Sequence, residues 1–133
     1  MQLTGQCLCG AVHFTVEDAL EYAGYCHCTR CRKRSGSAFN TFGGIRVDKL
    51  QITQGAAEVL RQDESDEGYD ALCARCHSPL FALVRNREYV HVRLGSLMDN
   101  PSRQPDHHIY VAWKAPWYQI TDNLPQFAEL PSD

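Results

Sequence analysis

Seven cysteines constrain this 133-residue chain more than any other feature, because they fall into three tight groups. The groups are Cys7 and Cys9, then Cys26, Cys28 and Cys31, and then Cys73 and Cys76. An odd number of cysteines, in a chain whose first residues lack the pattern of an export signal, argues against a disulfide framework. Close grouping of thiols is typical of sites that bind a soft metal ion. We therefore interpret the cysteines as metal ligands.

The composition predicts a single globular domain over residues 1–133. With 44% hydrophobic residues, a chain of this length can bury roughly two-thirds of the surface that its unfolded form exposes. The formal net charge of −3 argues against chain-wide binding of nucleic acid or of an acidic membrane. No apolar run approaches the ~20 residues that span a bilayer, and the start lacks a signal peptide, so we expect a cytoplasmic protein.

The hydrophobic pattern predicts a mostly β fold of short antiparallel strands, because no segment shows a sustained apolar period of 3.6 residues. Strands are expected within 11–16, 20–25, 38–45, 48–55, 58–61, 80–84, 89–94 and 108–112, and one helical turn within 29–33. The strand at 20–25 leads directly into Cys26, which predicts that the first two cysteine groups lie at the ends of neighbouring strands. The acidic segment 62–70 is interpreted as the solvated end of a hairpin rather than an acidic binding surface.

Two of the cysteine groups complete each other. The C-x-C pair Cys7/Cys9 and the C-x-x-C pair Cys73/Cys76 supply the four sulfurs of a structural zinc site. The pairs are separated by most of the chain, so this zinc would join the N-terminal strand to the second half of the sheet. His77 follows the second pair, where a sharp turn often requires a positive φ. Histidine tolerates that conformation better than most residues.

The third group is one ligand short of a tetrahedral zinc site. Its members are Cys26, Cys28 and Cys31. Either a histidine completes a closed site, or the fourth position is open to water or to a substrate thiolate. The histidines that could complete it are His27, His77, His107 and His108. Spacing alone leaves both interpretations open.

The chain beside this trio is strongly basic, which favours the open interpretation. The cations are Arg30, Arg32, Lys33 and Arg34. Such cations lower the pKa of neighbouring thiols and can receive the carboxylates of a small anionic ligand. The candidate contacts for an anionic thiol substrate are Arg32, Lys33, Ser35, Gly36 and Ser37, the last three through N–H groups and hydroxyls. The alternative is a solvated face that balances the acidic segment 62–70.

The stretches 5–12, 26–39 and 73–80, with 95–97, 108–109 and 120–127 further along, closely resemble the glutathione-dependent formaldehyde-activating enzyme (GFA) family. The resemblance implies a β-tent fold organised around zinc-cysteine knuckles. It implies a structural zinc on Cys7, Cys9, Cys73 and Cys76, and a second, more labile zinc on Cys26, Cys28 and Cys31. The activity it implies is condensation of glutathione with formaldehyde to S-hydroxymethylglutathione, formally a carbon–sulfur lyase reaction.

In such a reaction a zinc on three thiolates could bind the glutathione sulfur or polarise the aldehyde oxygen. His27 or His108 is a candidate acid for the proton, although each could equally be a structural residue. Two other functions stay open. One is a non-catalytic zinc-binding scaffold or binding module, as in the related centromere protein V. The other is a thiol redox sensor that releases zinc on oxidation.

Overall fold

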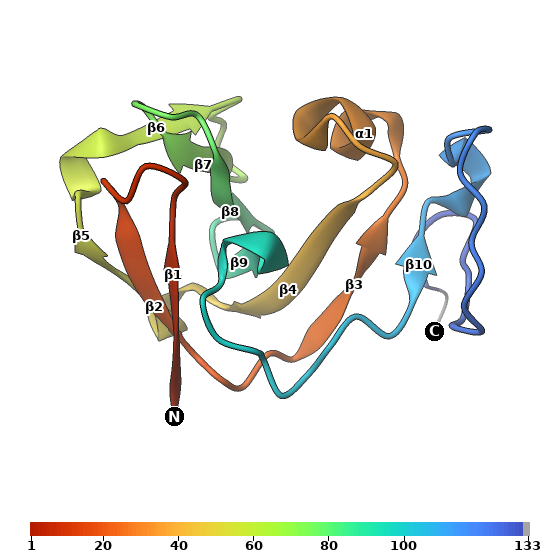
Figure 1. The fold of residues 1–133 in the computed structure, drawn as a ribbon, viewed down its shortest axis with the longest axis horizontal. Coiled ribbons are helices and arrows are strands. Elements are labelled where there is room, and N and C mark those ends of the chain that lie inside the picture. Colours follow the sequence, from red (N-terminus) through yellow and green to blue (C-terminus); the bar gives the residue numbers. More distant parts are fainter. Residues whose placement is uncertain (132–133) are drawn as a thin grey trace.

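The computed structural model describes residues 1–131, and in this part of the chain the strands form two β-sheets (Figure 1). The small sheet is antiparallel and consists of β1 (Gln2–Gln6), β2 (His13–Glu17) and β5 (Leu50–Gln54), in the order β1-β2-β5. The large sheet consists of β3 (Tyr22–Cys26), β4 (Asn40–Arg46), β6 (Val59–Gln62), β7 (Tyr69–Cys73), β8 (Pro79–Val84), β9 (Tyr89–Val92) and β10 (His108–Ile109). The expected domain includes residues 132 and 133, which lie outside the described part.

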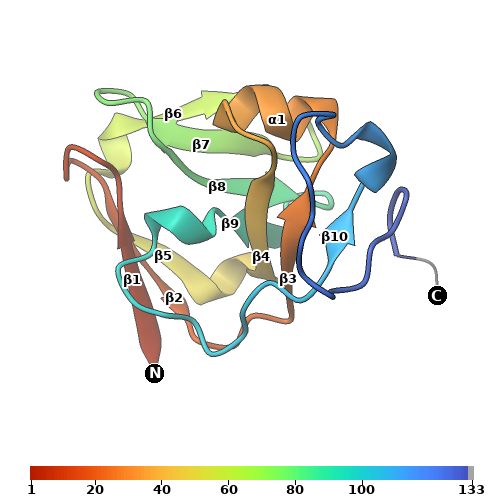
Figure 2. The same ribbon diagram turned by 45° about the vertical axis from the view of Figure 1, so that its right-hand side comes forward.

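The large sheet has the strand order β10-β3-β4-β9-β8-β7-β6. In both ribbon views its β10 edge lies beside the C-terminal segment, on the opposite side of the molecule from the small sheet (Figures 1 and 2). Every pair in it is antiparallel except β10 with β3, which is parallel. The predicted mostly β fold of short antiparallel strands is confirmed. The one parallel pair arises because a long loop over 97–107 returns the chain to the same end as β3.

The α-helix α1 (Thr29–Ser35) lies at the end of β3 and β4 (Figure 2). It begins at Cys28, whose Sγ accepts a hydrogen bond from the Cys31 N–H at 3.3 Å and so caps the first turn. It ends at Gly36, whose left-handed conformation (φ 66°) lets its N–H donate to Arg32 O. The predicted helical turn is therefore confirmed and is two residues longer than expected. Both of its ends are set by the sequence around the cysteine trio.

Short 3-10 helices connect several strands. They are η1 (Val47–Lys49), η2 (Ala56–Glu58), η3 (Leu94–Ser96) and η4 (Val111–Trp113). The predicted strand at 108–112 is thus shorter than expected, since only two of its residues pair and η4 follows. No helix among residues 1–131 is long and apolar enough to cross a lipid bilayer.

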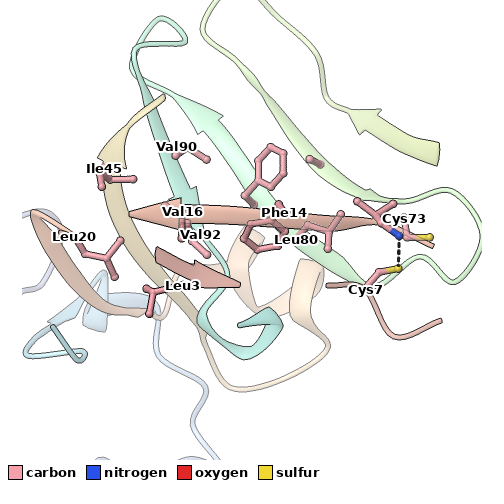
Figure 3. Close-up of a cluster of buried hydrophobic side chains, with 13 residues drawn as sticks. Leu3, Cys7, Phe14, Val16, Leu20, Ile45, Cys73, Leu80, Val90 and Val92 are labelled. Atoms are coloured by element: carbon pink, nitrogen blue, oxygen red, sulfur yellow. Dashed lines mark hydrogen bonds between the residues drawn. The ribbon is translucent and has the colours of Figure 1, made fainter. Parts of the chain in front are cut away.

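The hydrophobic core lies between the two sheets. Figure 3 shows Phe14 and Val16 of the small sheet beside Leu80, Val90 and Val92 of the large sheet. All five are essentially inaccessible to solvent, and each contributes about 1.5–3 kcal/mol through burial of its side chain. The alternation of burial along β2 is the pattern that the sequence predicts for residues 12–16. The core therefore fixes the two sheets, and with them the loops that carry cysteines.

The sequence did not predict β1, whose apolar content is small. Leu3 is its one large buried side chain, and Gly5 takes the next inward position. A Cβ on Gly5 would lie 2.3 Å from Cζ of Phe14, so the glycine makes room for that ring. The expectation that the first two cysteine groups end neighbouring strands is also wrong, since β2 and β3 belong to different sheets.

Candidate metal centres

The first cysteine cluster joins the two sheets. Cys7 and Cys9 lie in the loop between β1 and β2, Cys73 ends β7, and Cys76 lies in the turn before β8. Their four sulfur atoms all lie within 4.8 Å of one another, an arrangement that could hold a metal ion. The predicted partnership of these four residues is therefore present, and it links the small sheet to the β7–β8 hairpin.

Backbone N–H groups point at the sulfurs of this first cluster. The Val12 N–H donates to Cys7 Sγ at 3.2 Å, and the Arg75 N–H donates to Cys73 Sγ at 3.3 Å. The first of these is the dashed line in Figure 3. Such donors stabilise the thiolate form that binds metal. Hydrogen bonds from Ser78 likewise lower the pKa of the Cys76 thiol to about 5.

The turn around the first cluster adopts the predicted backbone. His77 has φ 62°, in the left-handed region, and its N–H donates to Cys73 O at 2.8 Å. The prediction of a positive φ after the C-x-x-C pair is confirmed. Ser78 Oγ accepts from the Leu8 N–H at 2.9 Å and lies 3.3 Å from Cys76 Sγ, so it connects the two cysteine loops.

The second cluster consists of Cys26, Cys28 and Cys31, whose sulfurs also lie within 4.8 Å of one another. Cys26 ends β3 and is buried, whereas Cys28 and Cys31 belong to the start of α1 and are half-buried. The Cys31 thiol donates to the Cys26 sulfur, which lowers the pKa of Cys26 to about 6 and raises the pKa of Cys31. The trio is thus prepared to bind a cation, with one thiol ionised near neutral pH.

No imidazole or carboxylate of residues 1–131 joins this second cluster. The histidines considered as a fourth ligand have other places. His107 Nδ1 lies 2.6 Å from Asp106 Oδ1, His77 lies beside the first cluster, and His27 Nε2 lies 2.8 Å from His108 Nδ1. Within the described residues, the trio therefore remains a three-ligand set.

His27, His108 and Asp122 form a buried hydrogen-bonded chain. The two rings are 0% and 1% exposed, and His108 Nε2 donates to the Asp122 carboxylate at 3.0 Å. Because a carboxylate only accepts, His108 Nδ1 is the acceptor for the Nε2–H of His27. Burial lowers the pKa of His27 to about 4, and its ring packs 5.5 Å from that of Phe39. His27 is consequently an interior residue, and its burial argues against a role as a solvent-linked acid at the trio.

A cleft of about 550 Å³ opens beside the trio, and we call it the thiol cleft. Cys26 and Cys31 line it together with Phe42 from β4 and Asp70 from β7. Arg93, which directly follows β9, is also in its wall. The trio therefore meets an accessible cavity on the face of the large sheet that carries Phe42.

An arginine clamp, formed by Arg30, Arg34, Asp63 and Asp70, holds α1 over this cleft. Arg30 Nη2 lies 2.9 Å from Asp70 Oδ2 and 3.3 Å from Asp63 Oδ2. Arg34 binds the same two carboxylates, at 3.2 Å in the case of Asp70. The Asp70 side chain is only 13% exposed. The acidic segment 62–70 is thus more than a solvated hairpin end, because α1 packs against both of its outer aspartates.

The family model described as "Glutathione-dependent formaldehyde-activating enzyme" matches residues 2–113. The chain belongs to the GFA family. A Halomonas elongata protein named "Putative glutathione-dependent formaldehyde-activating enzyme" is 32% identical over 130 residues, which cover 90% of this chain and 82% of that protein. A Rhodobacter sphaeroides protein of known crystal structure has a TM-score of 0.61 and 26% identity, covering 77% of this chain and 97% of its own.

Zinc fits the first cluster of this GFA domain by geometry. A tetrahedron with Zn–S bonds of about 2.3 Å has S···S edges of about 3.8 Å. The Cys7–Cys9 and Cys9–Cys73 sulfur distances are 3.7 and 3.8 Å. The second cluster offers the same sulfur donors in a three-ligand set, the arrangement of zinc sites that keep one position for a ligand.

The substrate contacts expected from the sequence lie elsewhere in this GFA domain. Arg32, Lys33, Gly36 and Ser37 line a cavity of about 270 Å³ with Trp117, and none of these residues lines the thiol cleft. Ser35 is the fifth residue of the predicted set, and its Oγ donates to Phe39 O at 3.1 Å. The structure therefore separates these five residues from the cavity at Cys26 and Cys31.

Sequence reasoning missed Asp70 and Arg93 as residues of the thiol cleft. Asp70 was hidden in an acidic run whose other members are exposed. Arg93 continues the alternation of Tyr89 and His91, opposite the buried Val90 and Val92 of β9. That period of two was a usable signal, because it assigns Arg93 to the same face as His91.

Proposed function

We propose that this GFA-family protein is a zinc-dependent carbon–sulfur lyase that joins glutathione or a related thiol to formaldehyde or another small aldehyde. The observation that carries the proposal is the three-cysteine cluster, two of whose members, Cys26 and Cys31, line a cleft of about 550 Å³. Small-molecule sites have volumes of roughly 300–1,000 Å³, so the cleft suits a substrate of this class. The family name supports the choice of thiol and aldehyde.

The reaction needs a sulfur nucleophile and a place for one proton. The thiol sulfur bonds to the aldehyde carbon as the carbon–oxygen π bond opens, and the thiol proton ends on the new hydroxyl oxygen. A zinc ion held by Cys26, Cys28 and Cys31 would supply a Lewis acid and favour the thiolate form of a bound thiol. The wall of the thiol cleft would orient the rest of the thiol.

Charges of both signs line the cleft and fit a zwitterionic thiol. Arg30 and Arg85 stand in its wall with Asp63 and Glu67. Glutathione carries an ammonium group and two carboxylates, so it presents partners for both kinds of side chain. Two fixed charges that recognise a substrate remote from its sulfur supply orientation as well as affinity.

The test is the rate of S-hydroxymethylglutathione formation, measured by exchange NMR at equilibrium so that the uncatalysed reaction is counted. Wild type should exceed the background, and Cys28→Ser should return to it. Arg75→Ala is the matched control, because Arg75 is exposed beside the first cluster and pairs only with Glu58 in the described structure. A wild-type rate equal to that of Cys28→Ser would exclude catalysis and favour the scaffold or redox-sensor alternatives.

A further inference from the structure

Arg93 is a buried cation in the wall of the thiol cleft. Its side chain is 14% exposed and shares the cleft with Cys26 and Cys31. Its Nη1 donates to Thr41 O at 3.4 Å, a long contact. A buried guanidinium is costly unless an anion compensates its charge. The question is therefore which anion Arg93 faces.

The charged residues of the cleft leave Arg93 without a close carboxylate. Its nearest is Asp70 Oδ1, at 3.8 Å, which is too long for a hydrogen bond. Asp70 Oδ2 already lies within 3.2 Å of both Arg30 and Arg34. Of the other lining charges, Arg85 is exposed, with its guanidinium 4.3 Å from the centre of the Tyr89 ring. Arg93 is thus the under-compensated cation among the arginines of this cleft.

The negative charge that compensates Arg93 is present in the sulfur cluster. Burial lowers the pKa of Arg93, whereas the neighbouring negative charge of Cys31, Asp70 and Cys26 raises it. Three thiolates around a divalent cation sum to −1, and a thiolate in the fourth position makes −2. A fixed cation beside a half-buried site offsets such charge.

A second donor lies next to Cys26. Asn40 pairs with Cys26 across β3 and β4, so the two side chains leave the same face of the sheet. Asn40 is 7% exposed, and its Nδ2 has no hydrogen-bond partner among the described residues. Both Asn40 and Arg93 therefore carry donor capacity that the described residues leave unused beside the trio.

We propose that Arg93 is a specificity-determining residue that selects an anionic thiolate over neutral ligands at the fourth position of the Cys26/Cys28/Cys31 cluster. The inference rests on the proposed function, since it concerns the ligand that the second cluster takes. It assigns the selection of the fourth ligand to one side chain that directly follows β9, and not to the basic flank of α1. The charge of Arg93 compensates the incoming thiolate, and a neutral ligand gains nothing from it.

The experiment uses the full chain loaded with Co²⁺, whose absorption bands report each added ligand. 2-Mercaptoethanol is the thiol probe and imidazole is the neutral probe. Arg93→Met should weaken thiol binding roughly 10- to 100-fold and leave imidazole binding within about 2-fold. Arg93→Lys should keep thiol binding within roughly 5-fold of wild type, because the charge remains. Arg46→Met is the control, because Arg46 is exposed over the Tyr89 ring and does not line the cleft, and it should match wild type.

Equal loss of thiol and imidazole binding in Arg93→Met would show a merely structural effect and overturn the inference, as would unchanged thiol binding. Metal content is counted first, and Arg93→Gln replaces Arg93→Met if the latter fails to retain two ions. The experiment also distinguishes failure of the proposed function from failure of the inference about Arg93. If wild type binds the thiol at cobalt with the expected Arg93 dependence but never accelerates the aldehyde reaction, the lyase proposal fails and the role of Arg93 stands.

Discussion

Replacing Asp70 by asparagine tests whether the arginine clamp sets both the stability of the fold and the second metal centre. Asp70 is the most buried carboxylate of the clamp and faces Arg30, Arg34 and Arg93. The substitution keeps the size of the side chain and removes its charge. Arg34, at 25% exposure, is then left in a poorly solvated region without its buried counter-ion.

The magnitude follows from this burial. Breaking a fully buried ion pair costs about 3–5 kcal/mol, and an exposed pair contributes about 0–1 kcal/mol. Asp70 lies nearer the first limit, so we expect a loss of about 2–4 kcal/mol in the free energy of unfolding. With an unfolding entropy of about 2.1 cal/mol/K per residue, 133 residues lose roughly 3–4 °C of Tm per kcal/mol, or about 7–14 °C in all.

Thermal unfolding of the metal-loaded protein, followed by circular dichroism, measures this loss. The matched control is Asp63→Asn, since Asp63 contacts Arg30 and Arg34 but is 56% exposed and should cost less than about 1 kcal/mol. Because α1 carries Cys28 and Cys31, Asp70→Asn should also speed metal release to a colorimetric chelator. The reasoning is refuted if the two variants lose equal stability, or if Asp70→Asn releases metal no faster than wild type.

Three further outcomes are expected. Burial lowers the pKa of His91 to about 4. Protonation of this side chain therefore favours the unfolded chain as the pH falls below 6.5. In urea titrations between pH 7 and pH 5, the free energy of unfolding of His91→Gln should fall by about 2 kcal/mol less than that of wild type. Parallel titrations of the two proteins would contradict this. His77→Val should cost about 1–2 kcal/mol, because a β-branched residue must then adopt φ 62°, whereas His77→Gly should stay near wild type in the same assay. A chelator should remove metal in two phases, fast from the three-cysteine cluster and slow from the four-cysteine cluster, and a fast phase that persists in Cys28→Ser would show the assignment to be wrong.

The pairing of cysteines was predictable because it depends on sequence-local geometry. C-x-C and C-x-x-C turns present two sulfurs each, and counting then leaves Cys26, Cys28 and Cys31 as the remainder. The period of two identified β2 for a similar reason, since burial alternates along one strand. The left-handed φ of His77 followed from the turn that such a pair requires. Each of these features is decided by a few consecutive residues.

The clamp and the thiol cleft were not predictable, because they depend on contacts between distant segments. Asp70 looks like any other member of an acidic run until α1 brings Arg30 and Arg34 beside it, 36 to 40 residues away in the chain. The basic flank of the trio was expected either to contact an anionic substrate or to balance the acidic segment 62–70, and two of its cations do bind carboxylates of that segment. The sequence did not show which acidic residues of the segment would be the partners. Gly5 is a similar case, since only the position of Phe14 explains it.

The two cysteine clusters differ in what holds their ligands, and this difference supports the proposed division into a structural and a substrate-binding site. The four-cysteine cluster bridges two sheets, so a metal there would help to hold them together, and its removal would loosen the fold. The trio is held from both sides by contacts within the protein. The clamp fixes α1 through Asp70, and the His27–His108–Asp122 chain fixes the segment between Cys26 and Cys28. A preformed three-sulfur set can release or exchange its fourth ligand without unfolding the domain, which is the property that a substrate-binding metal centre requires.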